Sequence, residues 1–362
     1  MKDRIYLPGL NGIRAIAALS VLLAHAEKFM GSVSTKNYFG NFGGYGVTIF
    51  FTLSGFLITF LMLKEIEKEK FIDVKKFYVR RILRIWPLYF FYFFIVLAIM
   101  KFQVSYNVLY YIFFIPNVPF AIQLATGSLV TIPLLLPYWS LGVEEQFYLI
   151  WPWIVKFSKN IKRTLILFCV GFFLLKVLLT IVHAPIIPQA LLYNTRFSCL
   201  SIGAIGAYFF YEKNKYISML NNKWIDLLSW VVLALFFANY VRIFSIINHE
   251  IISILSLIII FNQINNAKPL ISLENKVFDY LGKISFGLYV YNLIVIEYLN
   301  KLLLSAQLEK SYFFIILFIV LSAFVTIFIS HLSYNFLEKP FLKLKYNYTT
   351  IQSAASKSES QT

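Results

Sequence analysis

The sequence predicts an all-α, polytopic transmembrane bundle of about ten helices, and three observations lead to this fold class. Of the 362 residues, 59% are hydrophobic and only 14% are charged, whereas soluble domains carry about 25% charged residues. Apolar runs of about 20 residues recur along the chain, and this is the length at which a helix crosses a bilayer. Basic residues gather between these runs, as they do in the cytoplasmic loops of membrane proteins.

Ten apolar segments are expected to span the membrane. They are residues 9–27, 43–63, 84–101, 138–157, 162–182, 190–211, 224–241, 250–264, 284–303 and 312–334. A further apolar stretch, 107–124, contains Pro116 and Pro119. Because proline interrupts helical hydrogen bonding, we expect this stretch to be re-entrant or to lie along the membrane surface.

The distribution of lysine and arginine sets the expected orientation. Eight of these residues lie between Lys64 and Arg84, which places this loop in the cytoplasm. With ten spans, 23 of the 33 Lys and Arg residues fall on the cytoplasmic side and 6 on the other side. We therefore expect both termini in the cytoplasm, a membrane-embedded domain over residues 1–346, and a short, polar, disordered tail over 347–362.

The net charge of +16 would suit nucleic-acid binding in a soluble protein. In this chain the basic loops account for the charge, through topology and contact with membrane lipid, so we expect no nucleic-acid partner. Cys169 and Cys199 lie in apolar segments, and we expect neither a disulfide bond nor a metal site.

The first span carries two ionisable residues, Arg14 and His25. Eleven residues make about three helical turns, so the two side chains share a helix face and lie about 16 Å apart along the axis. Ionisable groups inside a membrane are costly and usually mark function. One interpretation is an anion-binding arginine with a general base. The other is an arginine that reaches to the membrane surface and a histidine hydrogen-bonded between helices.

The stretch YVRRILRIWP holds a second group of candidates. Arg81 and Arg84 are three residues apart, and Arg80 and Arg84 are four apart, so they share a face where a helix enters the membrane. Guanidinium groups bind phosphate through paired hydrogen bonds, and a cluster of them suits a polyphosphate. The alternative is a topogenic loop in contact with anionic lipid.

Glu144 and Glu145 lie just inside the expected outer end of the span 138–157. A carboxyl group at that depth requires a partner, and one of the two is expected to reach His25 across the outer half of the membrane. The alternative is an interfacial carboxylate among aromatic residues. The remaining histidines lie near span ends and are expected at the interface: His183, His249 and His331.

Six stretches, in the same order, resemble the motifs of the acyltransferase 3 family of bacterial integral-membrane acyltransferases. LNGIRAIAALSVLLAHA resembles the first helix of the family, IFFTLSGFLIT its second helix, and YVRRILRIWPLYF its Arg-x-x-Arg signature. YWSLGVEEQFYLIWP resembles the Trp-Ser-Leu-x-Val-Glu segment, NTRFSCLSIGAIGA the helix that bears Arg196, and NFLEKPFLK the close of the domain. The resemblance covers residues 5–345.

The resemblance implies an enzyme of the bacterial cytoplasmic membrane. It would move an acyl group, most often acetyl, from cytoplasmic acyl-CoA to a hydroxyl group of an extracytoplasmic cell-envelope glycan or lipid-linked saccharide. Acetyl-CoA would be a co-substrate, with no bound cofactor, and its phosphates would be held by Arg14, Arg81 and Arg84. His25 would act as a general base or as an acyl carrier. Glu144, which matches the acid of the Trp-Ser-Leu-x-Val-Glu segment, would be the second catalytic residue.

The same motifs imply supporting roles for four residues: Trp139, Ser140, Arg196 and Asn292. Two positions depart from the family pattern. Asn292 stands where many relatives have a histidine, which bears on proton handling there. Ser198 stands where an aspartate is frequent, which weakens the case for an Arg196–Asp pair.

The alternative function is a transporter of a lipid-linked saccharide or of the modified glycan, because an even number of spans fits both. A transporter needs broken helices at a midplane site, whereas an acyltransferase needs a phosphate-binding side and a base within reach of it. A sensor or scaffold would leave Arg14, His25 and Glu144 without a role. Acceptor selectivity is expected in loops 28–42 and 102–137, and the sequence does not indicate the oligomeric state.

Overall fold

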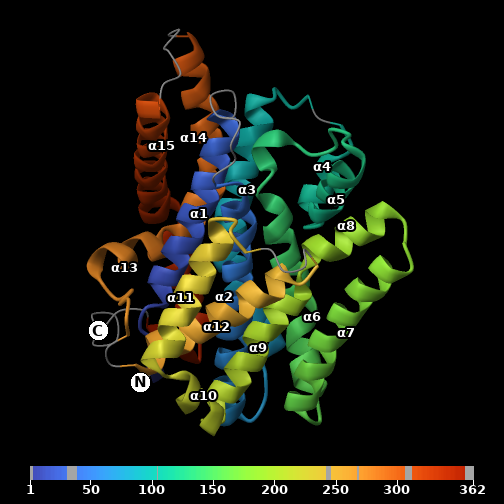
Figure 1. The fold of residues 1–362 in the computed structure, drawn as a ribbon, viewed down its shortest axis with the longest axis vertical. Coiled ribbons are helices and arrows are strands. Elements are labelled where there is room, and N and C mark those ends of the chain that lie inside the picture. Colours follow the sequence, from blue (N-terminus) through green and yellow to red (C-terminus); the bar gives the residue numbers. More distant parts are fainter. Residues whose placement is uncertain are drawn as a thin grey trace.

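The chain folds into a bundle of helices with one two-stranded sheet, seen in a computed structural model that describes residues 3–30, 39–103, 105–241, 246–266, 269–305 and 312–354 (Figure 1). The α-helices are α1 (Leu10–Met30), α2 (Gly40–Glu69), α3 (Val74–Ile99), α4 (Val108–Ile112), α5 (Asn117–Thr126), α6 (Tyr138–Phe157), α7 (Ile161–Ile181), α8 (Ile186–Thr195), α9 (Phe197–Tyr211), α10 (Lys215–Leu220), α11 (Lys223–Phe237), α12 (Asn248–Asn265), α13 (Lys276–Lys283), α14 (Ser285–Ser305), α15 (Tyr312–Ser333) and α16 (Lys339–Lys345). The shorter elements are the 3₁₀ turns η1 (Pro133–Leu135) and η3 (Tyr346–Tyr348), the π turn η2 (Tyr334–Glu338), and the strands β1 (Asp3–Tyr6) and β2 (Ile351–Ala354).

The expected all-α class is confirmed, with the small sheet as its one departure among the described residues. Four helices there are long and apolar enough to cross a membrane, judged by length and composition: Gly40–Glu69, Val74–Ile99, Ile161–Ile181 and Phe313–Tyr348. The count of ten spans stays a prediction. The stretch 107–124 forms α4 and α5, of 5 and 10 residues, and each is too short to cross a hydrocarbon core of about 30 Å.

One expected span is broken. Residues 190–211 were predicted as a single helix, but α8 ends at Thr195 and α9 begins at Phe197, with Arg196 between them at a φ of 46°. The single-helix prediction is therefore wrong. The sequence did not indicate the turn, because neither glycine nor proline stands at the break. A left-handed backbone at a non-glycine residue is costly, so the bonds that Arg196 makes must hold it in place.

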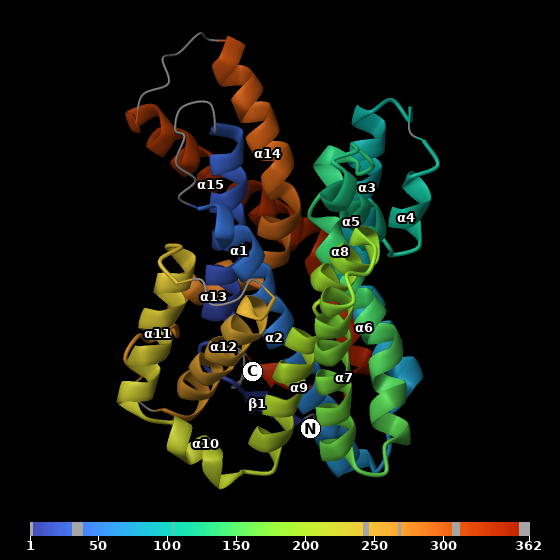
Figure 2. The same ribbon diagram turned by 45° about the vertical axis from the view of Figure 1, so that its right-hand side comes forward.

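The helix α2 runs through the middle of the bundle, between α1 and α9 (Figure 2). Two glycines allow α2 and α9 to approach closely. A Cβ atom on Gly55 would lie 1.9 Å from the carbonyl oxygen of Leu200, and one on Gly203 would lie 2.0 Å from that of Thr52. Small residues at such crossings are the usual means of packing helices tightly in membranes.

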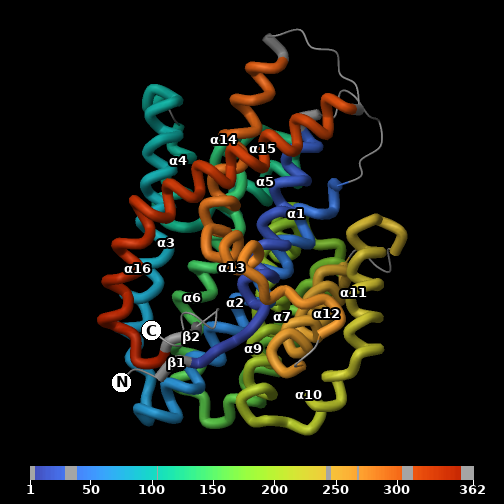
Figure 3. The backbone as a smooth tube through the Cα atoms, turned by 90° about the vertical axis from the view of Figure 1, so that its left-hand side faces the viewer, coloured from blue at the N-terminus to red at the C-terminus, as the bar shows by residue number. Residues whose placement is uncertain are grey.

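The C-terminal part returns to the N-terminus. The helix α15 continues through the π turn into α16, giving one bent helical run over Phe313–Tyr348 (Figure 3). Strand β2 then pairs in parallel with β1, from Asp3 opposite Ile351 to Tyr6 opposite Ala354. The prediction of a disordered tail from residue 347 is therefore wrong up to residue 354, and residues 355–362 lie outside the described part of the chain.

Candidate active site

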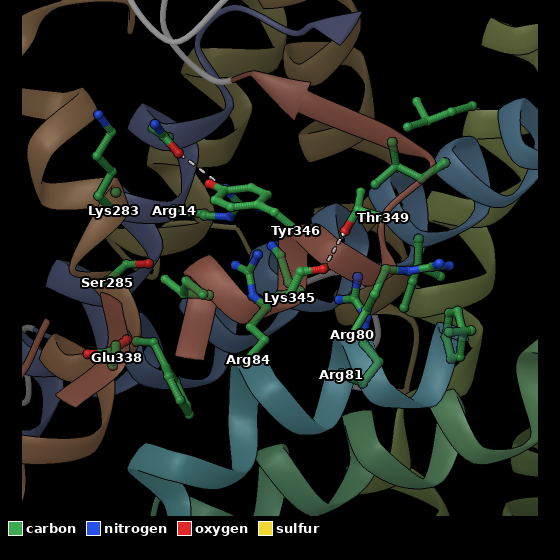
Figure 4. Close-up of a pocket in the computed structure, with 18 of the residues that line it drawn as sticks. Arg14, Arg80, Arg81, Arg84, Lys283, Ser285, Glu338, Lys345, Tyr346 and Thr349 are labelled. Atoms are coloured by element: carbon green, nitrogen blue, oxygen red, sulfur yellow. Dashed lines mark hydrogen bonds between the residues drawn. The ribbon is translucent and has the colours of Figure 1, made fainter. Parts of the chain in front are cut away.

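A basic cavity of about 180 Å³ lies at the end of the bundle that carries β1 and β2 (Figure 4). Its cationic lining residues are Arg14, Arg80, Arg81, Arg84, Lys283 and Lys345, and its acidic ones are Glu65 and Glu338. In the close-up, Arg14, Arg84 and Lys345 point toward shared space from three different helices, α1, α3 and α16. Such an excess of positive charge in a recess attracts polyanions.

Arg80 is already neutralised by the protein. Its Nη2 donates to Oε2 of Glu65 at 2.8 Å, and its Nη1 donates to the carbonyl oxygen of Tyr348 at 3.0 Å. Both charged side chains are buried, with exposed fractions of 11% and 6%. A buried ion pair of this kind is held by its own partners, so Arg80 serves the structure rather than a ligand.

Arg14, Arg81 and Arg84 line both the basic cavity and a second, inner cavity, and we refer to them as the shared arginines. Arg14 donates to Oδ1 of Asn11 at 3.1 Å. Within the described residues none of the three forms an ion pair with a carboxylate. The structure thus brings together the three residues predicted to hold phosphate, and leaves their charges uncompensated by direct ion pairs.

Arg81 also has an unusual setting among aromatic rings. Its guanidinium lies 5.7 Å from the ring centre of Phe77 and 5.6 Å from that of Tyr148, within cation–π range. Its buried Nε atom has no hydrogen-bond partner. A buried donor without a partner is costly in a folded protein, and an anion in either cavity would satisfy it.

The inner cavity, of about 120 Å³, has a mixed lining. Its apolar walls include Phe50, Phe51 and Leu57 of α2. Its polar groups beyond the shared arginines are Ser54, Ser140, Glu144, Ser285, Tyr148 and Tyr289. An uncharged, partly apolar chain with a few hydrogen-bonding groups would suit such a lining.

The prediction that Glu144 or Glu145 pairs with His25 is wrong. Oε1 of Glu144 accepts a hydrogen bond from Ser54 at 2.6 Å, and Glu144 faces the inner cavity with the shared arginines. Oε2 of Glu145 accepts from Trp86 at 3.2 Å. The error arises because the bounds of a span do not determine how far one helix is shifted along its neighbour.

His25 instead contacts Asn292 of α14, with 2.6 Å between Nδ1 and Oδ1. The amide Nδ2 of Asn292 donates to the carbonyl oxygens of Leu288 and Tyr289, at 2.9 and 2.6 Å. Only the NH₂ group can make these two bonds, so Oδ1 faces His25 and must accept from Nδ1–H. In the neutral imidazole this bond selects the tautomer with the proton on Nδ1 and the lone pair on Nε2.

His25 is not among the residues that line either cavity. It lies beyond the inner cavity, because Asn292, its partner, is one helical turn from Tyr289 of the cavity wall. The hydroxyl of Tyr289 donates to the carbonyl oxygen of Pro137 at 3.0 Å and also contacts the hydroxyl of Ser140. Ser140, predicted as a supporting residue, thus lines the inner cavity in contact with Tyr289.

Arg196 and Trp139, the other predicted supporting residues, lie in a separate buried network. The Arg196 guanidinium lies 5.2 Å from the ring centre of Trp139 and donates to the carbonyl oxygen of Gly44 at 2.8 Å. Its Nη1 also lies 3.2 Å from the hydroxyl of Thr48. That hydroxyl contacts Nδ1 of His249 at 2.8 Å. His249 is buried rather than interfacial, so that expectation is wrong.

Ser198 belongs to the same region, next to an ion pair. Its hydroxyl donates to Oε1 of Glu250 at 2.7 Å, and Lys176 donates to the same oxygen at 2.5 Å. The carboxylate next to Ser198 therefore comes from α12, and it is paired with Lys176 rather than with Arg196. These bonds join α7, α9 and α12 and give the network a structural role.

Sequence reasoning missed Ser54, Tyr289 and Lys345, and it gave Asn292 a supporting role without identifying His25 as its partner. Ser54 is a polar residue inside an apolar span, and Asn292 is an amide in another, and such residues are expected to have a partner. The sequence therefore indicated that Ser54 and Asn292 have hydrogen-bond partners, but not which residues these partners are. Lys345 gave no signal, since it reads as one more basic residue in a cytoplasmic segment.

The chain is similar to known proteins over most of its length. Residues 7–334 match the sequence profile of a family described as an acyltransferase domain. A Staphylococcus aureus (strain COL) protein, provisionally named an O-acetyltransferase, is 29% identical over 374 aligned residues, which cover 94% of this chain and 58% of that protein. O-acetyltransferase OatA of S. aureus (strain NCTC 8325) is 26% identical over 93% of this chain and 57% of its own length. This chain therefore spans less than two thirds of these relatives. No solved structure matches it.

Proposed function

The chain belongs to the acyltransferase 3 family, as an O-acetyltransferase-like membrane enzyme, and from this premise we propose its substrates. The donor is acyl-CoA, with acetyl-CoA as the first choice. The acceptor is a hydroxyl group on an extracytoplasmic glycan or lipid-linked saccharide of the cell envelope. The enzyme lies in the bacterial cytoplasmic membrane, with the basic cavity toward the cytoplasm, as the 23-to-6 distribution of Lys and Arg favours.

The observation that carries this proposal is the position of the shared arginines at the junction of two cavities. Acyl-CoA has a charged, phosphorylated nucleotide at one end and an uncharged pantetheine arm with the thioester at the other. The basic cavity suits the first part and the mixed lining of the inner cavity suits the second. Charge thus stays near the cytoplasm while the neutral acyl group moves inward, which avoids bringing phosphate into lipid.

His25 is the proposed general base. Asn292 leaves the lone pair of His25 on Nε2, and in the reaction Nε2 takes the proton of the acceptor hydroxyl. The hydroxyl oxygen attacks the thioester carbonyl, the C–S bond breaks, and an ester forms. The CoA thiolate then takes up the proton from His25, which returns the histidine to its neutral state.

Glu144 is a positioning residue in this proposal. Ser54 fixes its carboxylate beside the shared arginines. A single negative charge there balances part of their mutual repulsion while the donor is absent, and orients them for phosphate. Its contact with Ser54 keeps it on the donor side rather than beside His25.

The transporter alternative is not favoured. The chain has a broken helix at Arg196, which is a feature of transporter binding sites. The Arg196 side chain, however, already donates to Gly44 and Thr48 and lies over Trp139, so that in the described part of the chain only its buried Nε atom is left without a partner. The polar groups at the break are therefore bonded mainly within the protein, whereas the shared arginines have no ion-pair partner among the described residues.

The proposal is tested by transfer of label from radiolabelled acetyl-CoA to cell-surface glycans, comparing wild type with His25→Ala and Arg14→Ala. Wild type labels the glycan; His25→Ala falls to background, and Arg14→Ala needs more donor. The matched control is His183→Ala, a histidine in the turn after α7, which keeps wild-type activity. Undiminished labelling by a stably expressed His25→Ala protein would remove the catalytic assignment.

A further inference from the structure

The cations of the donor site are sorted by depth. Arg14, Arg81 and Arg84 line both cavities, whereas Lys283 and Lys345 line the basic cavity alone. Arg80, the remaining cation there, is engaged with Glu65. A polyanion that extends from the basic cavity to the inner one therefore meets Lys345 and Lys283 first and the shared arginines second.

Lys345 has no carboxylate partner among the described residues. No ion pair within 4.0 Å involves it. Its ammonium group lies 5.6 Å from the ring centre of Tyr346, and it shares the cavity with Arg14, Arg81 and Arg84. Positive charges gathered in a recess repel one another, more strongly where water is excluded. An anion in the basic cavity removes that cost.

The fold holds Lys345 firmly in this position. The bent helix from α15 brings α16 to the cavity, and the carbonyl oxygen of Tyr348 accepts from the buried Arg80. Beyond it, β2 pairs with β1. Thr349 and Thr350 of the connecting segment also line the cavity, so hydroxyl groups lie in the same wall as the ammonium group. The site is built rather than formed by a loose surface lysine.

Lys345 follows the residues that match the family model, 7–334. The segment after them adds Lys345, Thr349 and Thr350 to the wall of the basic cavity. Lys345 and Lys283 are thus the cations of the basic cavity that the inner cavity does not share.

We propose that the basic cavity binds the nucleotide end of acyl-CoA and that Lys345 contacts its 3′-phosphate. The shared arginines then hold the diphosphate, and the pantetheine arm extends into the inner cavity. The order of groups along the donor matches the order of cations from the termini inward. This assignment rests on the proposed function, because it takes acyl-CoA as the donor.

The chemistry of the 3′-phosphate fits this position. It is a monoester that carries close to two negative charges at neutral pH, and it is separate from the diphosphate. A compact ammonium group with three donors suits a terminal phosphate, while paired guanidinium groups suit the diphosphate. Lys345 would thus distinguish CoA from dephospho-CoA, which lacks only that group.

The experiment measures dissociation constants of CoA and dephospho-CoA for the full chain in detergent, by isothermal titration calorimetry. Wild type binds CoA about tenfold more tightly than dephospho-CoA, the loss expected for one charge-assisted contact. Lys345→Gln binds the two compounds equally, with its affinity for dephospho-CoA within about twofold of wild type. Lys345→Arg keeps the preference, because it keeps the charge.

The matched control is Lys343→Gln, an exposed lysine of the same helix that does not line the cavity; it keeps wild-type affinities. The inference is overturned if Lys345→Gln lowers the affinity for CoA and for dephospho-CoA by the same factor, or if it leaves the preference for CoA unchanged. It is also overturned if wild type binds the two compounds with equal affinity. A wild type that binds neither compound overturns the donor assignment itself. Thermal unfolding of each variant without ligand identifies a folding defect, and Lys345→Arg then decides the question.

Discussion

Asn292 and His25 form a hydrogen bond of 2.6 Å across 267 residues of sequence, and this bond determines which nitrogen of the imidazole carries the proton. The two residues lie on α14 and α1, which pack against each other. Because both amide hydrogens of Asn292 are used by backbone carbonyls of its own helix, its oxygen cannot turn away. The asparagine therefore acts on the chemistry through the histidine, as a positioning residue.

Replacing Asn292 with alanine is expected to lower kcat by about 10- to 100-fold, because His25 is then free to adopt the wrong tautomer and to rotate. The KM for acetyl-CoA stays near the wild-type value, since Asn292 does not line the donor cavities. Steady-state acetyl transfer by protein in detergent, with a soluble glycan fragment as acceptor, measures both constants. Asn262→Ala is the control, because Asn262 is equally buried and donates to backbone carbonyls in the same manner, but on α12. An equal rise in KM and fall in kcat for Asn292→Ala would contradict a positioning role.

The role of His25 as base or acyl carrier is tested without an acceptor. If Nε2 only takes a proton, wild-type protein mixed with radiolabelled acetyl-CoA and quenched rapidly retains no covalent label. If the histidine carries the acyl group, label appears on the protein in an amount close to one per chain, and His25→Ala abolishes it. We expect no such label, since in the base mechanism the acceptor oxygen attacks the thioester directly.

The sequence predicts those features of the site that lie within one helix, but not those that depend on how two helices pack together. The range 138–157 agrees with α6 residue for residue, because an apolar run bounded by polar loops defines a helix along its own axis. Helical periodicity, which operates within one helix, predicted that Arg81 and Arg84 share a face, and the family resemblance added Arg14 to them. The contact of Glu144 with Ser54 was not predictable, because the vertical offset and tilt of two helices arise from packing, such as the close approach at Gly55. The turn at Arg196 was missed for a similar reason, since its cost is balanced by bonds to distant α2.

The orientation of the chain is tested by cysteine labelling. In a background where Cys169 and Cys199 are alanine, a cysteine at Lys70, in the turn after α2, is expected to be protected in intact cells from a reagent that cannot cross membranes. A cysteine at Lys36, which lies outside the described residues, is expected to react. The physical reason is the positive charge of the loop after α2, which disfavours its translocation. Opening the cells exposes both positions and serves as the control, and the opposite pattern in intact cells would reverse the orientation.

Asp73 should make the stability of the chain depend on pH, because it caps α3, the helix that carries two of the shared arginines. Its side chain accepts from the backbone N–H of Lys76 at 2.9 Å, and this hydrogen bond lowers the pKa of Asp73 below its usual value. A lowered folded-state pKa gives stability that is present above the unfolded pKa of about 3.9 and lost as the pH falls through the folded value. Asp73→Asn keeps a neutral cap, so wild type is more stable by about 0.3–1 kcal/mol at pH 7, and the difference shrinks below about pH 4. Denaturant unfolding in detergent at pH 7 and pH 3 measures it, and a difference that does not change with pH would contradict this origin.

Within the basic cluster of α3, Arg80 has a structural role because it pairs with Glu65, whereas Arg84 is expected to bind the ligand. Arg80→Ala leaves the Glu65 carboxylate buried without its partner and is expected to lower the free energy of unfolding by about 3–5 kcal/mol. Arg84→Ala, four residues along the same helix, removes a charge with no ion-pair partner among the described residues. It should leave stability nearly unchanged and raise the KM for acetyl-CoA about tenfold or more, the cost of one charge-assisted contact. The double variant Arg80→Met with Glu65→Leu should regain most of the lost stability, because replacing both buried charges removes the unpaired one. If Arg80→Ala instead raised KM without loss of stability, Arg80 would bind the donor like the shared arginines. The structural role assigned to it from its contacts with Glu65 and Tyr348 would then be wrong.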